Sequence, residues 1–254
     1  MKIVLLGDPV EHSRSPAIHN AAFAALGIAG DYTARRVDAA QTRIAVDEIR
    51  YGRLDGANVT MPHKELAFDL SDRVAEDALR AGAVNTLVRS SGEVWGHNTD
   101  AAGMRAILKE PGWQESAPVL VLGTGGAAAG ALVAVAGRNV SIAGRRNEAA
   151  ADLLTRTRVD GTVVAWGAGV DGAIVVNATP LGMRGEALPD EILSVASGLL
   201  DLTYGSGPSP AVERARSLGI PVADGRDMLL AQAAVSFEIW TGLAAPVDVM
   251  RSAF

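Results

Sequence analysis

The stretch Val119-Leu-Val-Leu-Gly-Thr-Gly-Gly-Ala-Ala-Ala-Gly130 decides the fold of this chain. Four apolar residues predict a buried strand, and a glycine-rich turn then opens a helix rich in alanine. In that context Gly123 makes the tight turn, Gly125 lets the backbone approach a pyrophosphate, and Ala128 allows close packing of helix on strand. The amides of the helix N-terminus would bind the phosphates. A purely structural turn is the alternative.

The segment after the next predicted strand, residues 140–143, selects the cofactor. A fold that prefers NAD carries an acidic residue there, about 20 residues past the first glycine, to bind the ribose. This chain instead has Gly144-Arg145-Arg146. Two guanidinium groups suit a 2′-phosphate, so NADP is the expected cofactor. A pair of exposed loop arginines without that role is the alternative.

Short apolar runs alternate with helical patterns from end to end, which is typical of βαβ units and a parallel sheet. A first series predicts strands at residues 3–6, 32–37, 56–59 and 86–88 and helices at 16–26, 41–51 and 72–81. A second series predicts strands at residues 119–122, 140–143, 163–166, 174–176, 199–202 and 222–223. Six strands is the number in a full dinucleotide-binding sheet.

The expected fold class is α/β with two domains, an N-terminal α/β substrate-binding domain and a Rossmann-type doubly wound parallel sheet. A helix-like link at 101–108, followed by the breaker Glu110-Pro-Gly112, separates residues 1–101 from the NADP-binding residues 102–228. Residues 226–241 predict a long helix that packs back on the first domain, so 229–254 complete it. The apolar face of this helix is Met228, Leu229, Ala233, Phe237 and Trp240. The cleft between the domains is the natural active site.

The composition excludes several classes of protein. Cysteine is absent, which rules out disulfides and thiolate nucleophiles and makes the cytoplasm the default location. The four histidines lack any metal-binding spacing, so no metal is expected. A net charge of -6 without a basic block argues against nucleic-acid binding, and no apolar run approaches the ~20 residues that span a bilayer. The expected partner is a small-molecule substrate, and the chain should be a monomer or homodimer.

Missing motifs narrow the chemistry. Neither a GxSxG elbow nor a GxxxxGK[ST] loop is present, which disfavours a hydrolase or an NTPase. No tyrosine has a lysine four residues later, so a lysine is the expected proton donor of an oxidoreductase. Lys64 lies just past Pro62, in the first turn of a predicted helix, where a cation opposes the helix dipole. It is therefore a functional candidate, with a solvated surface lysine as the alternative.

Other polar residues of the first domain have two interpretations each. Asp100 closes Asn98-Thr-Asp100 before a helix, and it can be an N-cap or can pair with Lys64 and orient it. Ser13 and Ser15 precede a helix that starts near Pro16. Ser15 can be the N-cap with Pro16 at N1, or the two hydroxyls at the helix N-terminus can form a carboxylate site.

These pieces, in this order, resemble the shikimate dehydrogenase family over nearly the whole chain. The motifs that carry the resemblance are Gly7-Asp-Pro-Val-Glu-His-Ser-Arg-Ser-Pro16, Gly56-Ala-Asn-Val-Thr-Met-Pro-His-Lys64, Gly82-Ala-Val-Asn-Thr86, Asn98-Thr-Asp100, Gly123 to Gly130, Asn177-Ala-Thr179 and Gly225 to Gln232. The resemblance implies reversible, NADPH-dependent reduction of 3-dehydroshikimate to shikimate, a step toward chorismate and the aromatic amino acids.

The resemblance also implies roles for individual residues. Ser13 and Ser15 would hold the substrate carboxylate, and Lys64 would give the proton to the carbonyl oxygen with Asp100 beside it. The substrate hydroxyls would be held by Thr60, Asn85, Asp100 and Gln232. Tyr204 would close the cleft. The cofactor would be bound by Gly123, Thr124, Gly125, Gly126, Ala127, Gly144, Arg145, Arg146, Asn147, Glu148, Ala149, Leu202 and Gly225, with Glu76 a weaker candidate.

Two alternatives remain open. Relatives that use quinate and NAD tend to carry an acid near the position of Arg145, and they can replace one of the two serines by threonine. This chain shows neither change, which favours NADP and shikimate. A regulator that binds NADP without catalysis is the second alternative, and the presence of both Lys64 and Asp100 disfavours it.

Overall fold

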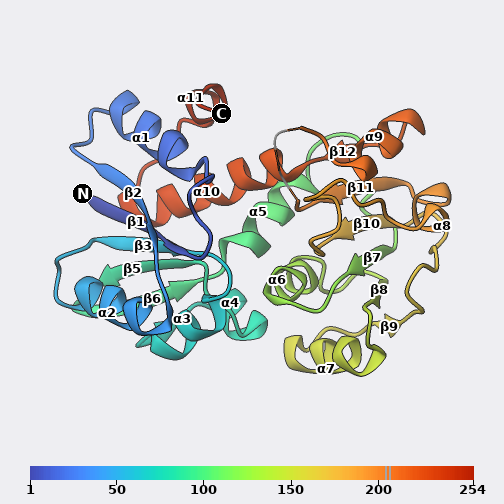
Figure 1. Cartoon of the computed structure of the whole chain (residues 1–254), viewed down its shortest axis with the longest axis horizontal. Coiled ribbons are helices and arrows are strands. Elements are labelled where there is room, and N and C mark those ends of the chain that lie inside the picture. The colour runs from blue at the N-terminus through green and yellow to red at the C-terminus, as the bar shows by residue number, and fades with distance from the viewer. Residues whose placement is uncertain (204, 206) are drawn as a thin grey trace. The chain divides into compact units, whose positions relative to one another are not determined.

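The structure, a computed structural model, describes residues 1–203, 205 and 207–254. It divides into two compact units (Figure 1). Unit 1 comprises Met1–Gly103 and Leu229–Phe254, and unit 2 comprises Met104–Met228. The two divisions fall inside helices, α5 (Thr99–Ile107) and α10 (Gly225–Thr241). Each unit contains its own six-stranded sheet, in agreement with the predicted α/β class.

The sheet of unit 1 has the order β2-β1-β3-β5-β6-β4. Its strands are β1 (Lys2–Gly7), β2 (Asp31–Arg36), β3 (Gly56–Val59), β4 (Arg73–Val74), β5 (Thr86–Ser90) and β6 (Glu93–His97). β1 is parallel to β2 and β3, whereas β5 is antiparallel to both β3 and β6. The prediction of a parallel sheet is therefore wrong for this unit, which has a mixed sheet.

The antiparallel pair arises from a tight hairpin that the prediction missed. Ser91 and Gly92 connect β5 to β6 with φ angles of 51° and 83°. Two successive positive φ angles define a turn whose twist matches that of paired antiparallel strands. The Ser-Gly dipeptide was the available signal, because such dipeptides mark turns. β6 follows this turn directly, at residues for which the sequence predicted no strand.

The predicted helix at 72–81 is also partly wrong, since β4 occupies its first residues and helix α4 begins only at Glu76. Asp72 explains the change. Its backbone N–H donates to the oxygen of Val94, and its carboxylate accepts from the N–H of Val94 at 2.8 Å. β4 therefore pairs with β6, and a helix would have broken this pairing. Without β6 in the prediction, residues 73–74 had no visible strand partner.

Helices cover both faces of this sheet (Figure 1). They are α1 (Ser15–Ala25), α2 (Ala39–Arg50), α3 (Lys64–Leu70), α4 (Glu76–Ala81) and α11 (Val247–Ser252), together with the part of α10 that belongs to unit 1. α1, α10 and α11 share a core with Ile3 and Leu5 of β1, while α2 and α3 share another with Val4 and Leu6. The predicted apolar face of α10 is confirmed in unit 1, because Leu229, Ala233, Phe237 and Trp240 are buried.

The sheet of unit 2 confirms the predicted doubly wound architecture. All its strands are parallel, in the order β12-β11-β10-β7-β8-β9. They are β7 (Val119–Leu122), β8 (Val140–Ala143), β9 (Thr162–Val163), β10 (Ile174–Asn177), β11 (Gly198–Asp201) and β12 (Val222–Ala223). The strand predicted at 163–166 is shorter and shifted in the structure, where β9 lies at the edge of the described sheet, beside β8.

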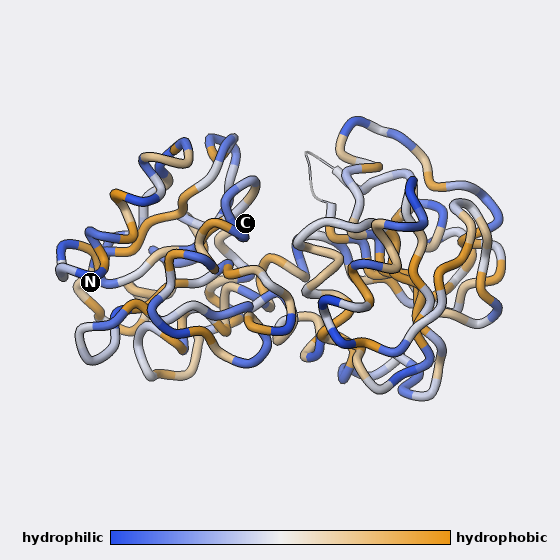
Figure 2. The backbone as a smooth tube through the Cα atoms, turned by 90° about the horizontal axis from the view of Figure 1, so that it is seen from below, coloured by the Kyte–Doolittle hydropathy of each residue, from blue (hydrophilic) through white to orange (hydrophobic). Residues whose placement is uncertain are grey.

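The helices of unit 2 are α6 (Gly126–Ala134), α7 (Asn147–Thr157), α8 (Asp190–Ser194) and α9 (Pro210–Ser217). Residues of α8 and α9 form one core with Leu120, Leu122 and Val175 of the central strands. In Figure 2 hydrophobic segments run through the middle of each unit and many outer turns are hydrophilic. Within the described residues, no helix has both the length and the apolar character that a membrane span requires.

His19 lies in the interior of unit 1. Its ring stacks on Tyr32, with 4.5 Å between centroids, and lies 5.2 Å from the ring of Trp240. The side chain is fully buried, and among the described residues neither ring nitrogen has a hydrogen-bond partner. Burial lowers the pKa of His19 to about 3, since a charged imidazolium would be desolvated there. The folded protein therefore keeps this ring neutral over most of the pH range.

This burial predicts that His19 weakens the fold in acid. Below the unfolded pKa of 6.5, His19 takes up a proton in the unfolded chain but not in the folded chain. The contribution of the neutral His19 to the free energy of unfolding is therefore fully present above pH 6.5 and is lost as pH falls toward 3. His19→Leu removes this term. The free energy of unfolding of the wild type relative to His19→Leu should fall by about 2 kcal/mol between about pH 7 and about pH 5 in urea titrations. Parallel pH dependences would contradict the prediction, and exposed His12→Leu is the control.

Candidate functional site

Lys64, Asn85 and Asp100 come together in unit 1. The Nζ atom of Lys64 lies 2.6 Å from one carboxylate oxygen of Asp100, and the Nδ2 atom of Asn85 donates to the other oxygen at 2.9 Å. The side chains of Lys64 and Asp100 are 19% and 15% exposed. This ion pair is thus largely removed from water, where a charged pair is screened less than on the surface. The pairing of Asp100 with Lys64 proposed from the sequence is present.

The alternative role of Asp100 as an N-cap is wrong. The residue before α5, Asn98, fills it, because its Oδ1 atom accepts from the N–H of Ala101 at 3.1 Å. Asp100 lies in the first turn, where a negative charge is favourable near the helix N-terminus. Since the cap is supplied elsewhere, both carboxylate oxygens of Asp100 are left for Lys64 and Asn85.

Lys64 begins α3, in agreement with the predicted first-turn position. Its backbone oxygen accepts from the N–H of Val84 at 2.9 Å, which ties the start of α3 to the segment that leads into β5. Asn85 is tied in turn, because its N–H donates to the oxygen of His97 at 3.0 Å. Burial lowers the pKa of His97, so this neighbour favours its neutral form. Main-chain contacts therefore position Lys64 and Asn85, the two residues that bind the carboxylate of Asp100.

The sequence did not reveal a set of buried polar side chains beneath this pair. They are Asn58, Thr86, Thr99 and Ser236, each no more than 5% exposed. Asn58 accepts from the hydroxyl of Tyr32 at 2.8 Å and donates to the hydroxyl of Thr86 at 2.9 Å. A signal was available, since Asn58 is a polar residue inside a strand that is buried at every position. Such a residue needs hydrogen-bond partners.

The interpretation of Ser15 as an N-cap is wrong. Arg14 is the N-cap residue of α1, and Ser15 is its first helical residue. The N–H of Ser15 donates to the hydroxyl of Ser13 at 3.2 Å, and the two hydroxyl oxygens are also 3.2 Å apart. Ser15 is buried and Ser13 is half-buried. The structure therefore brings the two predicted carboxylate-binding hydroxyls together at the start of the helix, as a carboxylate site requires.

Of the three remaining predicted substrate residues, the structure describes Thr60 and Gln232. Thr60 is half-buried next to Gly7, where a methyl group would lie 2.3 Å from the Cγ2 atom of Thr60. Gln232 faces the N-terminus of α5, because its Oε1 atom accepts from the hydroxyl of Thr99 at 3.3 Å. Gln232 is half-buried. Tyr204 lies outside the described residues.

The glycine loop of unit 2 has the features that a phosphate site needs. Gly123 has a φ of 116°, and a Cβ atom there would lie 2.8 Å from the backbone oxygen of Ala178. Gly125 is the N-cap of α6, and a Cβ atom on it would meet open space. In the described part of the chain no side chain caps α6, and the first backbone amides of a helix have no partner within the helix itself, so this end can donate to a phosphate. Thr124, Gly126 and Ala127 complete the turn, half-buried.

The predicted 2′-phosphate residues lie at the neighbouring strand end. β8 pairs with β7, and the N–H of Gly123 donates to the oxygen of Ala143 at 2.8 Å. Gly144 is buried against Thr124, whereas Arg145 and Arg146 are both exposed. α7 then starts with Asn147, Glu148 and Ala149, and no described side chain caps it. Two exposed guanidinium groups beside such a helix start fit the charge of a 2′-phosphate, in agreement with the choice of NADP.

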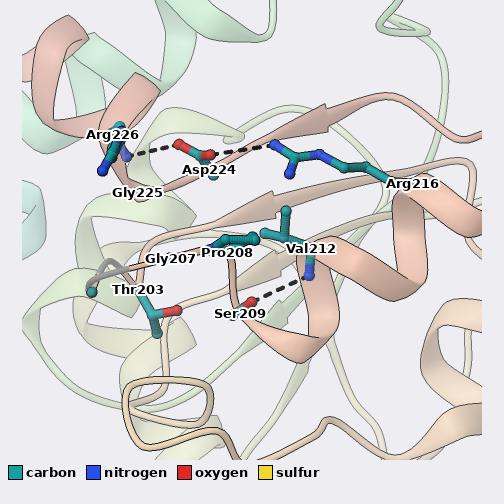
Figure 3. A pocket seen from close by; sticks show the side chains of 10 residues that line it. Thr203, Gly207, Pro208, Ser209, Val212, Arg216, Asp224, Gly225 and Arg226 are labelled. Carbon is teal, nitrogen blue, oxygen red and sulfur yellow. Dashed lines mark hydrogen bonds and ion pairs between the residues drawn. The ribbon is translucent and has the colours of Figure 1, made fainter.

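A pocket of about 350 Å³ opens in unit 2 (Figure 3). It is lined by Thr203, directly after the cofactor candidate Leu202, and by a second candidate, Gly225. Two of the lining residues, Asp224 and Arg216, form an ion pair at 3.6 Å. Because Gly225 starts α10, the pocket adjoins the start of a helix that continues into unit 1. A further cofactor candidate from the sequence, Glu76, belongs to unit 1, whereas the glycine loop belongs to unit 2.

A buried carboxylate, that of Asp201, binds two of the residues that line this pocket, Thr203 and Ser209. The Oδ1 atom of Asp201, at the end of β11, accepts from Asn177 at 2.9 Å and from the N–H and hydroxyl of Thr203 at 3.0 and 2.9 Å. Its other oxygen accepts from the hydroxyl of Ser209, the N-cap of α9. Asp201 therefore joins the ends of β10 and β11 to the start of α9. No sequence motif had singled out this residue.

Comparison with known proteins places these features in one family. The family model described as the shikimate dehydrogenase substrate binding domain matches residues 5–87, and that of the shikimate 5'-dehydrogenase C-terminal domain matches 225–253. Two curated relatives are both named shikimate dehydrogenase (NADP(+)). The protein of Desulfitobacterium hafniense is 34% identical, covering 98% of this chain and 95% of its own. That of Methanocella arvoryzae is 40% identical, covering 97% and 95%.

A solved structure agrees with these relatives. It is shikimate 5-dehydrogenase from Thermus thermophilus in complex with NADP(H) and shikimate. Its TM-score to this chain is 0.91 at 32% sequence identity, and the match covers 100% of this chain and 98% of that one. The similarity in fold and sequence thus extends over both units.

The glycine loop predicts different costs for two similar substitutions. Gly123→Ala should lower the free energy of unfolding by about 1–3 kcal/mol, because the residue has a left-handed φ and its new methyl would press on the oxygen of Ala178. Gly125→Ala is the matched control and should change it by less than about 1 kcal/mol, since the added methyl meets open space. Urea unfolding of both variants tests this. Equal stabilities would show that the loop tolerates a side chain at Gly123.

Proposed function

This chain belongs to the shikimate dehydrogenase family, and we propose that it reduces 3-dehydroshikimate reversibly to shikimate with NADPH, with Lys64 as the proton donor. The reaction belongs to the shikimate pathway, which leads to chorismate and the aromatic amino acids. The observation that carries the proposal is the 2.6 Å pair of Lys64 with Asp100. When bound, NADPH supplies the hydride, and this chain's residues supply the proton and the binding of substrate.

Lys64 fits the role of the general acid. Reduction of a ketone places negative charge on the carbonyl oxygen, and a positioned ammonium group can neutralise that charge by giving a proton. Asp100 holds the Nζ atom and thereby limits the rotamers of a long flexible side chain. In the reverse direction the same amine accepts the proton from the hydroxyl of shikimate. Asn85, through Asp100, helps to keep the pair in one geometry.

Ser13 and Ser15 are proposed to bind the substrate carboxylate. The two hydroxyls are adjacent, and they lie at the N-terminus of α1, where the aligned backbone dipoles favour an anion. Thr60, Asn85, Asp100 and Gln232 are proposed to bind the hydroxyls, and Tyr204 is proposed to contact the substrate as well. The absence of cysteine fits a reducing compartment, and we propose that the enzyme acts in the cytoplasm as a monomer or homodimer.

The direct test is the oxidation of NADPH, followed by absorbance, with 3-dehydroshikimate as substrate and with shikimate and NADP in the reverse direction. Quinate and NAD are tested in the same assay. Turnover with 3-dehydroshikimate and a preference for NADPH support the proposal. A preference for quinate and NAD would identify a quinate/shikimate dehydrogenase instead. Binding of NADPH without turnover of either substrate would identify a regulator.

Lys64→Ala should lower kcat by about 10²- to 10⁴-fold, the usual contribution of general acid catalysis, and should raise KM far less. The reason is that a proton donor acts in the transition state. The exposed Lys109→Ala is the control, because it removes the same charge from a different place and should retain wild-type kcat. A kcat of Lys64→Ala within about threefold of wild type, or ~0.6 kcal/mol, would remove Lys64 from this role.

Arg145 and Arg146 should set the preference for NADP over NAD. A hydrogen bond to a charged group contributes about 1.5–3 kcal/mol, so Arg145→Ala should cost about 10- to 150-fold in kcat/KM for NADP and little for NAD. If Arg146 shares the contact, the double variant shows the full loss. Arg156→Ala, exposed at the other end of α7, is the matched control. An unchanged NADP to NAD ratio in the double variant would mean that the phosphate is bound elsewhere.

A further inference from the structure

Three buried hydroxyls of unit 1 form a closed triangle, which we call the hydroxyl triad: Thr86, Thr99 and Ser236. The oxygen atoms of Thr86 and Thr99 are 3.2 Å apart, those of Thr86 and Ser236 are 2.9 Å apart, and those of Thr99 and Ser236 are 3.1 Å apart. The three residues are 0–1% exposed. They come from β5, from α5 and from α10, so the triad joins three separate segments of the chain.

Ser236 anchors the triad to the helix that carries Gln232. Its hydroxyl donates to the backbone oxygen of Gln232 at 3.0 Å, which uses its only proton. Ser236 can therefore only accept from the other groups around it. These are Thr86, Thr99 and the Nδ2 atom of Asn58 at 3.1 Å, and the two lone pairs of Ser236 can accept from two of the three at a time. Ser236 thus acts as an acceptor within the cluster, and it is one of the groups that set where the single protons of Thr86 and Thr99 point.

The triad is connected directly to Asn85. The hydroxyls of Thr86 and Thr99 each lie 3.2 Å from the Oδ1 atom of Asn85, and the N–H of Thr99 donates to the same atom at 2.8 Å. The carbonyl end of the Asn85 amide is therefore held on the triad side. Its NH2 end must then face Asp100, to which it donates at 2.9 Å. The orientation of this amide determines whether Asp100 receives a donor or meets a second acceptor.

We propose that Ser236 is a positioning residue for the reaction: it holds the hydroxyl triad, the triad orients Asn85, and Asn85 fixes Asp100 and Lys64. This inference rests on the proposed roles of Lys64 and Asp100. The hydrogen bonds of Ser236 given above reach neither member of the ion pair, so its effect passes through the amide. Without the hydroxyl oxygen of Ser236, the hydroxyls of Thr86 and Thr99 lose a shared acceptor. Both then compete for the Oδ1 atom of Asn85, and the bond from the Nδ2 atom of Asn85 to Asp100 loosens.

A purely structural role makes a different prediction. Many buried serines in helices donate to the carbonyl four residues earlier and affect only stability. Thr42 is a comparable residue in this chain, because it is fully buried in α2 and its hydroxyl donates to the oxygen of Asp38 at 2.7 Å. Its helix, α2, contributes to the other core of unit 1, and the hydrogen bond of the Thr42 hydroxyl reaches neither the triad nor the ion pair. Thr42→Val is therefore the matched control for the loss of a buried hydroxyl in the same unit.

The test compares Ser236→Ala and Thr42→Val in the reduction of 3-dehydroshikimate by NADPH. We expect Ser236→Ala to lower kcat about 3- to 30-fold, the range for one buried hydrogen bond that acts on the transition state, without a change in KM for NADPH. Thr42→Val should keep the wild-type kcat even if its thermal unfolding midpoint falls. A wild-type kcat in Ser236→Ala would overturn the proposal, as would an equal loss of kcat in the two variants.

A double-mutant cycle tests the route through the ion pair. If Ser236 acts by way of Asp100, then Ser236→Ala should lower kcat by less than about twofold when it is added to Asp100→Asn, because the interaction it supports is already lost. Additive losses would overturn the route. The proposed function fails separately: a wild-type enzyme that does not reduce 3-dehydroshikimate refutes the function, whereas an active wild type with an unaffected Ser236→Ala refutes only this inference.

A second variant covers the case in which Ser236→Ala does not fold. Thr86→Val removes the hydroxyl 2.9 Å from Ser236 and keeps the shape of the side chain. It enters the same cycle with Asp100→Asn, and the same non-additive loss of kcat is expected. Loss of kcat that adds to that of Asp100→Asn would overturn the proposal in this form too.

Discussion

The orientation of one side-chain amide underlies the geometry of the ion pair in unit 1. Asn85 has its oxygen held by the N–H of Thr99 and its nitrogen by Asp100, so it cannot rotate without breaking both contacts. A flipped amide would present its oxygen to a carboxylate, which is repulsive in a half-buried site. The ion pair of Lys64 with Asp100 therefore inherits its geometry from backbone and hydroxyl groups beneath it. Those groups are uncharged, which spares the interior the cost of further buried charges.

The candidate binding groups of unit 2 differ from those of unit 1 in having few partners among the described residues. In unit 1 the candidate catalytic groups are bonded to one another before any ligand binds, while in the described part of unit 2 the glycine loop keeps helix amides uncapped and its neighbouring guanidinium groups exposed. Donors that face solvent are suited to a polyanion that arrives from it, because binding replaces water without breaking internal bonds. The two units thus differ as the proposed reaction site, whose groups are already bonded to one another, differs from the proposed phosphate site, whose guanidinium groups are exposed.

The sequence predicted what local patterns encode. The six strands of unit 2, the glycine turn, the first-turn place of Lys64 and its pairing with Asp100 all follow from short motifs. The failures share a different cause. β4 exists only because β6 is beside it, and the pairing that defines them joins residues such as Arg73 and Trp95 that are distant in the chain. The hydroxyl triad brings together residues separated by up to 150 positions, and no local rule connects a serine of the last long helix to a threonine of a strand. The caps of α1 and α5 failed on a smaller scale, since more than one polar residue competed for each helix start.

Asp201 bears on how such a protein can diverge. It ties Thr203 on one side and Ser209 on the other to the ends of β10 and β11, so both borders of the intervening segment are anchored by one carboxylate. An anchor of this kind allows the strand ends to stay the same while the segment between the anchored residues changes. Substitutions that keep Asp201, Thr203 and Ser209 leave the bonds between these strand ends and the start of α9 in place, so residues between the two anchored positions can be changed, by evolution or by design, without breaking that network.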